Sequence, residues 1–412
     1  MTPAPTTAPA VSPPTAPHRP RFRALDGLRL VGALAVLTTH VGFESGDALE
    51  GRFAGLLSRL DVGVALFFVV SGFLLFRPHA MGHLQGHRRP RPAAYLVRRV
   101  ARIVPVLWVV VAAAWLLVRE DAPTADYLAH AFLVQIYVGT PQTVGLTQLW
   151  SLCTEVAFYL VLPLVAALAC RGPRDRRWVR RMSAAAAVLV VAGPVWMAVV
   201  TVMGQSQARL WLPGFVGWFG LGMLLAVWHA ARTTGVLPAG RLDRLAAYPG
   251  TLWAVAAALF VLASTPVAGP LDLSEPSALQ AATKSLLYAV IGVLLVLPTV
   301  LTVPPADEPA AVRALSGRVG VGLGLISYGV FAYHVLILEL VSRWLGLATF
   351  EGGFWQRWLL TATLAVAVSA VSYALVERPV MRRVRTLPSL GRRRPSPSTT
   401  HSEAATPSHT PA

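Results

Sequence analysis

The sequence predicts an all-α protein, a polytopic helical bundle that crosses a membrane about ten times. Of its 412 residues, 55% are hydrophobic and 13% are charged, whereas a typical soluble domain has about 25% charged residues. Too few charges remain to cover the surface of a water-soluble globule. The apolar residues also form long continuous runs, which indicate membrane helices, whereas an outer-membrane barrel shows short alternating segments. The composition therefore argues against a soluble enzyme, a nucleic-acid-binding protein and a disordered protein.

Ten apolar stretches are candidate membrane spans, and three of them are short for a hydrocarbon core about 30 Å thick. They cover residues 28–43, 62–77, 99–118, 147–169, 181–203, 210–230, 250–266, 282–303, 321–345 and 355–376. The first is expected to act as an uncleaved signal anchor. Residues 1–20, rich in Pro, Thr and Ala, and 386–412, rich in Arg, Pro, Ser and Thr, read as disordered tails. A single membrane domain, residues 21–385, lies between them.

The charge distribution predicts the orientation of the bundle. Ten spans place both tails on one side, and 29 of the 36 basic residues fall on that side. Acidic residues such as Asp47, Glu120 and Asp272 fall on the other side. By the positive-inside rule both termini are cytoplasmic, and the protein is a multi-pass protein of the inner or plasma membrane. The net charge of +17 thus reflects orientation and contact with lipid headgroups, and no nucleic-acid partner is expected.

Ionisable residues inside spans are costly, which makes them candidates for a functional site. Arg29 and His40 are eleven residues apart, so they lie about 16.5 Å apart along a helix, close to three full turns, and share one face. Counted from the ends of the expected spans, Glu155 and His334 lie at nearly the same depth as His40. The sequence therefore predicts a buried polar chamber near the middle of the membrane.

Six sequence segments surround these residues in order. They are Arg-Ala-Leu-Asp-Gly-Leu-Arg (23–29) followed by ten residues and His40, Asp-Val-Gly-Val-Ala-Leu-Phe-Phe-Val-Val-Ser-Gly-Phe (61–73), Arg-Arg-Val-Ala-Arg-Ile-Val-Pro (98–105), Trp-Ser-Leu-Cys-Thr-Glu-Val-Ala-Phe-Tyr (150–159), Ser-Tyr-Gly-Val-Phe-Ala-Tyr-His (327–334) and Glu-Arg-Pro (377–379). Each segment alone is weakly specific. Together, from about residue 21 to 385, they closely resemble the membrane-bound acyltransferase 3 family.

The resemblance implies an integral membrane O-acyltransferase. Such an enzyme transfers an acyl group, commonly acetyl, from cytoplasmic acyl-CoA to a hydroxyl of a sugar-containing acceptor, either a surface glycan or a glycosylated natural product. The partners implied are acyl-CoA, a carbohydrate acceptor and membrane lipids, with no permanently bound cofactor and no metal. The Arg-x10-His pair of the family falls on Arg29 and His40, and its acidic residue falls on Glu155.

The residue chemistry favours the same assignments. A hydroxyl becomes a good nucleophile when a base takes its proton, and histidine, with an unperturbed pKa of about 6.5, suits that role. We therefore expect His40 to act as general base, with Glu155 as the carboxylate that orients it. Planar guanidinium groups suit the phosphates of CoA. The cofactor-binding candidates are Arg29, Arg98, Arg99, Arg102 and Ser71, and the substrate-binding candidates are His334 and Tyr333.

Other readings of the same residues stay open at this point. The main alternative is a transporter or flippase of a glycan or small metabolite that uses the buried charges as a substrate or proton path, although the sequence shows no internal repeat. His40 is an acyl-carrying nucleophile in a second version of the enzyme hypothesis. Structural interpretations also exist for the other candidates. Glu155 could be an ion-pair partner, His334 a packing residue, and the arginines ordinary positive-inside charges. The acceptor, the acyl chain length, the face of acylation and the oligomeric state are left open.

Overall fold

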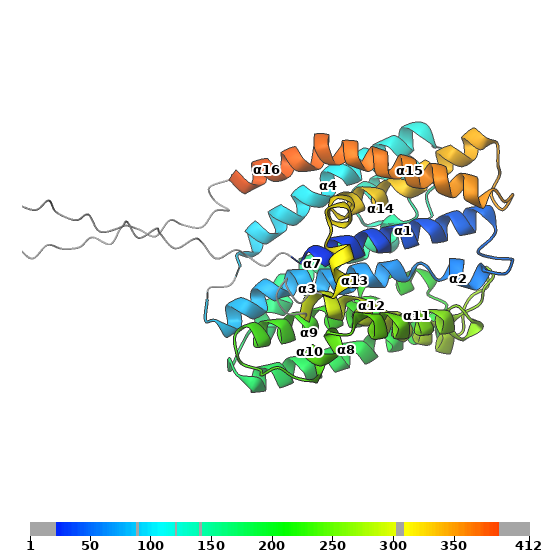
Figure 1. Ribbon diagram of the computed structural model, residues 1–412. Coiled ribbons are helices and arrows are strands. Elements are labelled where there is room, and N and C mark those ends of the chain that lie inside the picture. The colour runs from blue at the N-terminus through cyan, green and yellow to red at the C-terminus, as the bar shows by residue number, and fades with distance from the viewer. Residues whose placement is uncertain (1–21, 88–89, 120–121, 140–141, 302–308, 387–412) are drawn as a thin grey trace, which may run out of the picture.

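The computed structural model describes residues 22–87, 90–119, 122–139, 142–301 and 309–386, and all their regular secondary structure is helical (Figure 1). Within these residues, nine helical segments are long and apolar enough to cross a membrane. They are α1 (Arg23–Ser45), α2 with α3 (Ala54–Ser58, Val62–Leu84), α4 (Pro92–Leu117), α7 (Leu149–Ala169), α8 (Arg176–Val202), η2 with α9 (Leu212–Phe215, Val216–Thr233), α12 (Ala278–Leu301), α14 (Arg318–Leu345) and α15 with η5 and α16 (Phe354–Ser372, Tyr373–Glu377, Arg378–Thr386).

The multi-pass helical bundle expected from the sequence is confirmed. Nine of the ten expected spans correspond to these segments, and the remaining one, 250–266, corresponds to the shorter apolar helix α11 (Pro249–Ala263). With α11 included, α1 begins and α16 ends at the same end of the bundle (Figure 1). The connections hold short elements, namely α5 (Thr124–Ala131), α6 (Gln135–Val138), η1 (Ser206–Leu210), α10 (Arg241–Ala246), η3 (Pro266–Ala268) and α13 (Ala310–Leu315).

The domain boundaries stay a prediction, because both expected tails lie outside the described residues apart from Thr386. We call the end where α1 begins the inner end and the opposite end the outer end. These names follow the orientation predicted from the charges, in which the inner end faces the cytoplasm.

Local sequence signals explain where the helices start. Pro92 occupies the first turn of α4, where its missing N–H costs no hydrogen bond. Asp175 is the N-cap of α8, and its carboxylate accepts a hydrogen bond of 2.8 Å from the backbone N–H of Arg177. This bond satisfies one of the free donors at the helix start.

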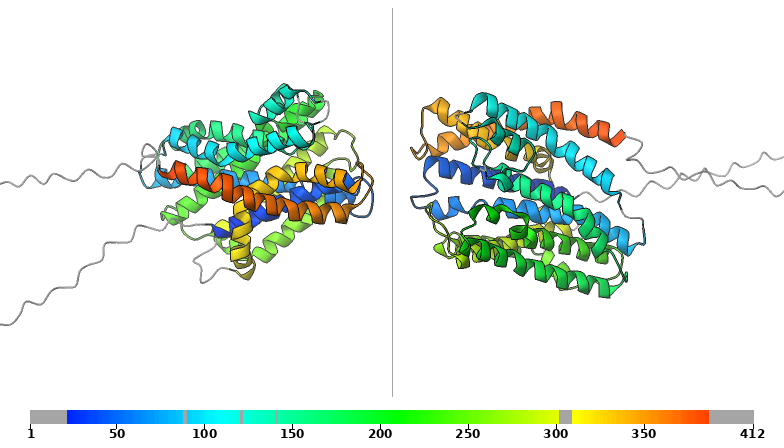
Figure 2. Two further views of the ribbon diagram at one scale, coloured as in Figure 1. Left: turned by 90° about the horizontal axis from the view of Figure 1, so that it is seen from above. Right: turned by 180° about the vertical axis from the view of Figure 1, so that it is seen from behind.

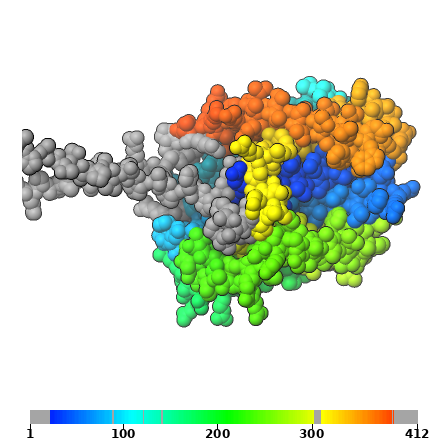
Figure 3. Space-filling view, in the orientation of Figure 1, coloured from blue at the N-terminus to red at the C-terminus, as the bar shows by residue number. Residues whose placement is uncertain are grey.

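The bundle consists of two groups of helices that meet at α1 and α3. In one group α1 packs against α14, and α14 packs against α15; in the other, α3 packs against α9, and α8, α12 and α11 extend the layer (Figures 1 and 2). The short helix α13 runs across α1 between the groups (Figure 3). α7 contacts both α3 and α4. The seam between the groups is where the candidate site lies.

The closest helix contact in the second group is between α3 and α9. A Cβ atom at Gly72 would clash with the carbonyl oxygen of Phe219, and one at Gly222 would clash with the carbonyl oxygen of Val69. Glycine at both positions allows the two backbones to touch, as small residues do in membrane helix pairs. α3 and α9 are therefore fixed against each other at the depth of the site.

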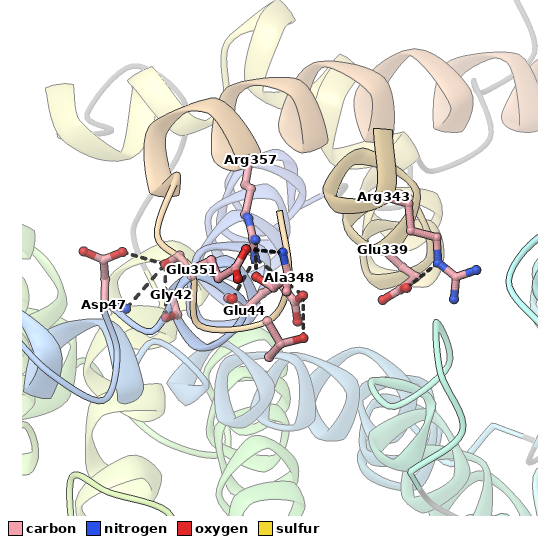
Figure 4. A network of polar contacts seen from close by, with 10 residues as sticks. Gly42, Glu44, Asp47, Glu339, Arg343, Ala348, Glu351 and Arg357 are labelled. Atoms are coloured by element: carbon pink, nitrogen blue, oxygen red, sulfur yellow. Dashed lines mark hydrogen bonds and ion pairs between the residues drawn. The ribbon is translucent and has the colours of Figure 1, made fainter. Parts of the chain in front are cut away.

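A buried arginine holds the outer end of α1. Arg357 on α15 is completely buried, and it donates hydrogen bonds to the carbonyl oxygens of Glu44, at 2.6 Å, and Ala348, at 2.7 Å (Figure 4). The backbone N–H of Phe350 donates to the same Glu44 carbonyl at 2.8 Å. Nearby on α14, Glu339 pairs with Arg343 at 2.6 Å. The network ties the last turn of α1, just beyond His40, to α15.

Candidate active site

A polar cavity lies at the seam, near the inner end of the bundle. It has a volume of about 130 Å³. Its charged and polar lining comes from α1, α3, α4, α7 and α14, and comprises Arg29, Ser71, Arg99, Arg102, Glu155, Tyr159 and Tyr328. The guanidinium group of Arg99 lies between two aromatic rings, 5.9 Å from the centroid of Tyr95 and 5.8 Å from that of Tyr159. The structure therefore brings together three of the four arginines selected from the sequence, and we call this space the arginine cavity.

Glu155 supplies the carboxylate of the arginine cavity. Its Oε1 accepts a hydrogen bond from the Ser71 hydroxyl and another, at 2.6 Å, from the Tyr159 hydroxyl. Tyr159 lies four residues after Glu155, so both side chains are on one face of α7. Ser71 also lines the cavity. A single carboxylate among three guanidinium groups leaves the cavity with an excess of positive charge.

A second, wider cavity adjoins the first at Arg102 and reaches the inner end. It has a volume of about 340 Å³ and is also lined by Tyr373, Glu377, Arg378 and Arg382. Glu377 ends the π-helical turn η5, is 4% exposed, and interacts electrostatically with Arg102 and Arg29. π-helical turns are frequent at functional sites. The two cavities share Arg102, so basic side chains line both the space near the inner end and the space beside Glu155.

The two predicted histidines, by contrast, form a pair of their own. The ring centroids of His40 on α1 and His334 on α14 are 5.1 Å apart. His334 is completely buried, and its Nδ1 donates to the Phe331 carbonyl oxygen at 2.7 Å. Since a carbonyl accepts only, Nδ1 carries the proton and Nε2 is an acceptor. Among the described residues, Nε2 of His334 has no hydrogen-bond partner.

A third, small cavity extends from the arginine cavity towards the histidines. It shares Arg29, Ser71 and Glu155 with the arginine cavity and is also lined by Phe67 and Phe331. The rings of these two phenylalanines are 5.8 Å apart. Phe331 is in turn 5.9 Å from the His334 ring. One layer of aromatic rings thus separates the small cavity from the histidine pair. His40 lines none of the three cavities described so far.

The depth expected for Glu155 is wrong. The Gln148 side chain, just before α7, donates at 2.7 Å to the carbonyl oxygen of Ala332, in the middle of α14. α7 therefore begins inside the bundle, and Glu155 lies seven residues, about 10 Å, further towards the inner end. His40 and His334 do coincide in depth, at about 25 Å along their helices. Glu155 lies with the arginines and is not placed to orient His40.

Two other candidates lie away from these cavities. Arg98 is half-buried but is not part of their lining. Tyr333 is 4% exposed, and its hydroxyl lies 3.0 Å from that of Ser372 on α15. This contact gives Tyr333 a role in joining α14 to α15.

Sequence reasoning missed three residues of the polar path. Tyr159 is the first of them. Its position four residues after Glu155 places both side chains on one face of a helix, which was a usable signal. Glu377, in the Glu-Arg-Pro segment, is the second. An ionisable side chain so close to the end of a span was a reason to consider it a site residue. Tyr328, whose hydroxyl donates to the Ile103 carbonyl oxygen at 2.9 Å, had no spacing signal because its partner is on another helix.

The fold and the cavities define a multi-pass membrane protein with a basic path leading into the bundle from one end. The chain belongs to the acyltransferase 3 family, because the family described as "Acyltransferase domain" matches residues 22–377. The protein is thus a membrane-bound O-acyltransferase, as the sequence resemblance implied. Membership in this family also disfavours the alternative of a transporter or flippase.

Individual relatives support the family assignment. The chain is 28% identical to Nodulation protein 10 of Rhizobium leguminosarum bv. viciae, over 89% of this chain and 94% of that protein. It is 28% identical to the acyltransferase MdmB of Streptomyces mycarofaciens, over 92% and 95% of the two chains. It is 22% identical to the peptidoglycan O-acetyltransferase OatA of Listeria monocytogenes, over 87% of this chain and 56% of OatA. No solved structure matches the chain significantly.

Proposed function

We propose that the protein transfers an acyl group, most simply acetyl, from acyl-CoA to a hydroxyl of a sugar-containing acceptor. The acceptor class is supported by the name of the relative OatA, a peptidoglycan O-acetyltransferase, and includes glycosylated natural products. The observation that carries the proposal is the convergence of Arg29, Arg99 and Arg102 on one cavity. Their positive charge lies where a polyphosphorylated donor entering from the cytoplasm would arrive.

The basic path fits the shape and charge of acyl-CoA. Guanidinium groups bind phosphate through two parallel hydrogen bonds, and Arg102 borders both the wide inner cavity and the narrow arginine cavity. We assign the wide cavity, with Arg378 and Arg382, to the nucleotide end of CoA. The thin pantetheine arm then passes Ser71 and points the thioester towards the histidine pair.

His40 acts as general base in this proposal. It takes the proton of the acceptor hydroxyl as the oxygen attacks the thioester carbonyl carbon. The new C–O bond forms an ester, the C–S bond breaks, and the CoA sulfur leaves as a thiolate that takes the proton back from His40. The neighbouring His334 ring, whose Nε2 is an acceptor without a partner in the described residues, accepts a hydrogen bond from protonated His40 or from the acceptor hydroxyl in this scheme. Phe67 and Phe331 move aside for the thioester.

Glu155 has a positioning role in this scheme. It holds the hydroxyls of Ser71 and Tyr159 and keeps part of the arginine charge balanced before the donor binds. It thereby shapes the passage through which the pantetheine arm runs.

The proposal is tested with the purified protein reconstituted in liposomes with a native glycan fraction. Radiolabelled acetyl-CoA should give base-labile label on the glycan, with one CoA released for each ester formed. Label that appears without CoA release, or wild-type protein that neither binds CoA nor esterifies any acceptor, would overturn it.

A further inference from the structure

A separate cavity opens near the outer end, and nothing above gives it a function. It has a volume of about 330 Å³ and lies between the start of α3, the η1–η2 segment, η3 and the start of α12. One wall is a chain of aromatic side chains. The rings of Trp150 and Phe215 are 5.5 Å apart, those of Phe215 and Trp218 are 4.9 Å apart, and those of Trp218 and Tyr288 are 6.0 Å apart. We call this space the outer cavity.

The outer cavity also contains an ion pair. Lys284, the only lysine in the chain, lies 2.7 Å from the Asp61 carboxylate, and both side chains keep about a third of their surface exposed, at 30% and 36%. The Tyr288 hydroxyl lies against the same carboxylate and 3.0 Å from the Arg59 carbonyl oxygen. An ion pair at this position is costly. The two charges of this pair compensate each other. Of the other charged residues in the lining, Arg209 pairs with Glu275 and the Arg59 guanidinium donates to backbone carbonyl oxygens.

A buried hydroxyl in the lining has no partner within the described part of the chain. Ser285 is 4% exposed, lines the outer cavity, and its Oγ makes no hydrogen bond. Its backbone carbonyl oxygen accepts a hydrogen bond of 2.9 Å from the indole N–H of Trp218, which fixes that aromatic ring. A buried hydroxyl without a partner costs free energy, and a ligand hydroxyl in the cavity removes that cost.

The outer cavity lies close to the proposed chemistry. Phe215 lines it, and the Phe215 ring is 5.5 Å from that of Phe68, which lines the small cavity beyond the arginines. Asp61 is close enough to His40 for an electrostatic interaction. One layer of rings therefore separates the outer cavity from the donor path.

We infer that the outer cavity binds the acceptor as a neutral sugar ring, which stacks on the aromatic wall and hydrogen-bonds to Asp61 and Ser285. The inference rests on the proposed function. Aromatic faces suit the apolar C–H face of a sugar, and a carboxylate accepts from its hydroxyls. A lipid acyl chain would leave the buried Ser285 hydroxyl without a hydrogen bond, which disfavours it. Deep, mostly apolar cavities with a few convergent polar groups are typical ligand sites.

The test is to block the outer cavity with a thiol reagent that is added outside the cell. Ser274 is exposed at the cavity mouth, and Ser274→Cys is labelled in intact cells of the native host with a bulky, membrane-impermeant maleimide. Ala125→Cys is the matched control, because Ala125 is exposed on α5, also near the outer end but away from the cavity. The native Cys153 and Cys170 are free and buried. The measurements are the base-labile acyl groups on the glycan and the affinity of the labelled, purified protein for CoA.

Labelling of Ser274→Cys should lower glycan acylation at least tenfold relative to the same variant unlabelled, and leave the Kd for CoA within twofold. Labelling of Ala125→Cys should change neither. Full labelling of Ser274→Cys with unchanged acylation would overturn the inference, and so would failure of the reagent to reach the introduced thiol from outside. The variant Asp61→Asn gives a second test: acylation should fall about tenfold, and an unchanged rate contradicts the inference. Wild-type protein without any CoA binding would instead overturn the proposed function.

Discussion

The imidazole rings of His40 and His334 lie 5.1 Å apart although nearly three hundred residues separate them in the sequence. α1 and α14 pack side by side and place the rings at one depth. The Phe331 carbonyl oxygen fixes the tautomer of His334 and leaves its Nε2 as an acceptor. The pair thus contains the elements of a proton-transfer site in the interior of the bundle.

The first prediction concerns the base. His40→Ala should lower acyl transfer by at least 10²-fold, which is the contribution usual for general acid–base catalysis, and should leave insertion and CoA affinity intact. The measurement is the initial rate of acetyl transfer in liposomes, together with CoA binding. His87→Ala is the control, because His87 is exposed at the inner end. A turnover of His40→Ala near that of the wild type would remove His40 from the mechanism.

The second prediction distinguishes the roles of Arg98 and Arg102, which both lie on α4. Arg102 lines both inner cavities, whereas Arg98 lines neither. Arg102→Ala should weaken CoA binding by a factor of about 10 to 100, because a charge-assisted hydrogen bond contributes about 1.5–3 kcal/mol. It should also reduce the salt dependence of the Kd. Arg98→Ala should stay within twofold of the wild type. Equal effects of the two substitutions would show that only the general positive charge of this end matters.

The third prediction concerns Glu155. Glu155→Gln retains the side-chain size but turns one oxygen into a donor, which disturbs the bonds from Ser71 and Tyr159. We expect kcat to fall about tenfold while the KM for acetyl-CoA stays the same or falls, since a negative charge on the path of the anionic donor is gone. A raised KM with unchanged kcat would contradict the positioning role, and wild-type values of both would make Glu155 purely structural.

The sequence predicted the helical spans and the arginine cluster well, because both depend on local signals. Apolar runs mark the spans, and the spacing of Arg99 and Arg102 places them on neighbouring turns of α4. The depth of Glu155 depends instead on where α7 begins, and that is set by the hydrogen bond from Gln148 to Ala332, a contact between distant helices. The pairing of Asp61 with Lys284 in the outer cavity likewise depends on a contact between helices that are far apart in the sequence.

The fourth prediction is a pH dependence of stability. His130 on α5 is completely buried, its Nδ1 lies 2.8 Å from the Asp126 carbonyl oxygen, and burial lowers the pKa of His130 below its usual value. The unfolded chain, with a histidine pKa of about 6.5, therefore binds more protons than the folded chain below that pH. This contribution to stability is complete above about pH 6.5 and is lost as the pH falls through the folded-state pKa.

Thermal unfolding of the solubilised protein between pH 7.5 and 5 measures this effect. The loss is at most about 1.4 kcal/mol for each pH unit, and His130→Leu should flatten the profile relative to the wild type. The exposed His87 again gives the control variant. Equal slopes for wild type and His130→Leu would assign the pH dependence to other groups.

The backbone contact between Gly72 and Gly222 bears on how the donor passage of the proposed mechanism widens. Because α3 and α9 touch backbone to backbone, they behave as one unit, and Ser71 keeps a fixed position relative to α9. A thioester that travels past Ser71 is therefore admitted by rotation of side chains such as Phe67 and not by separation of these two helices.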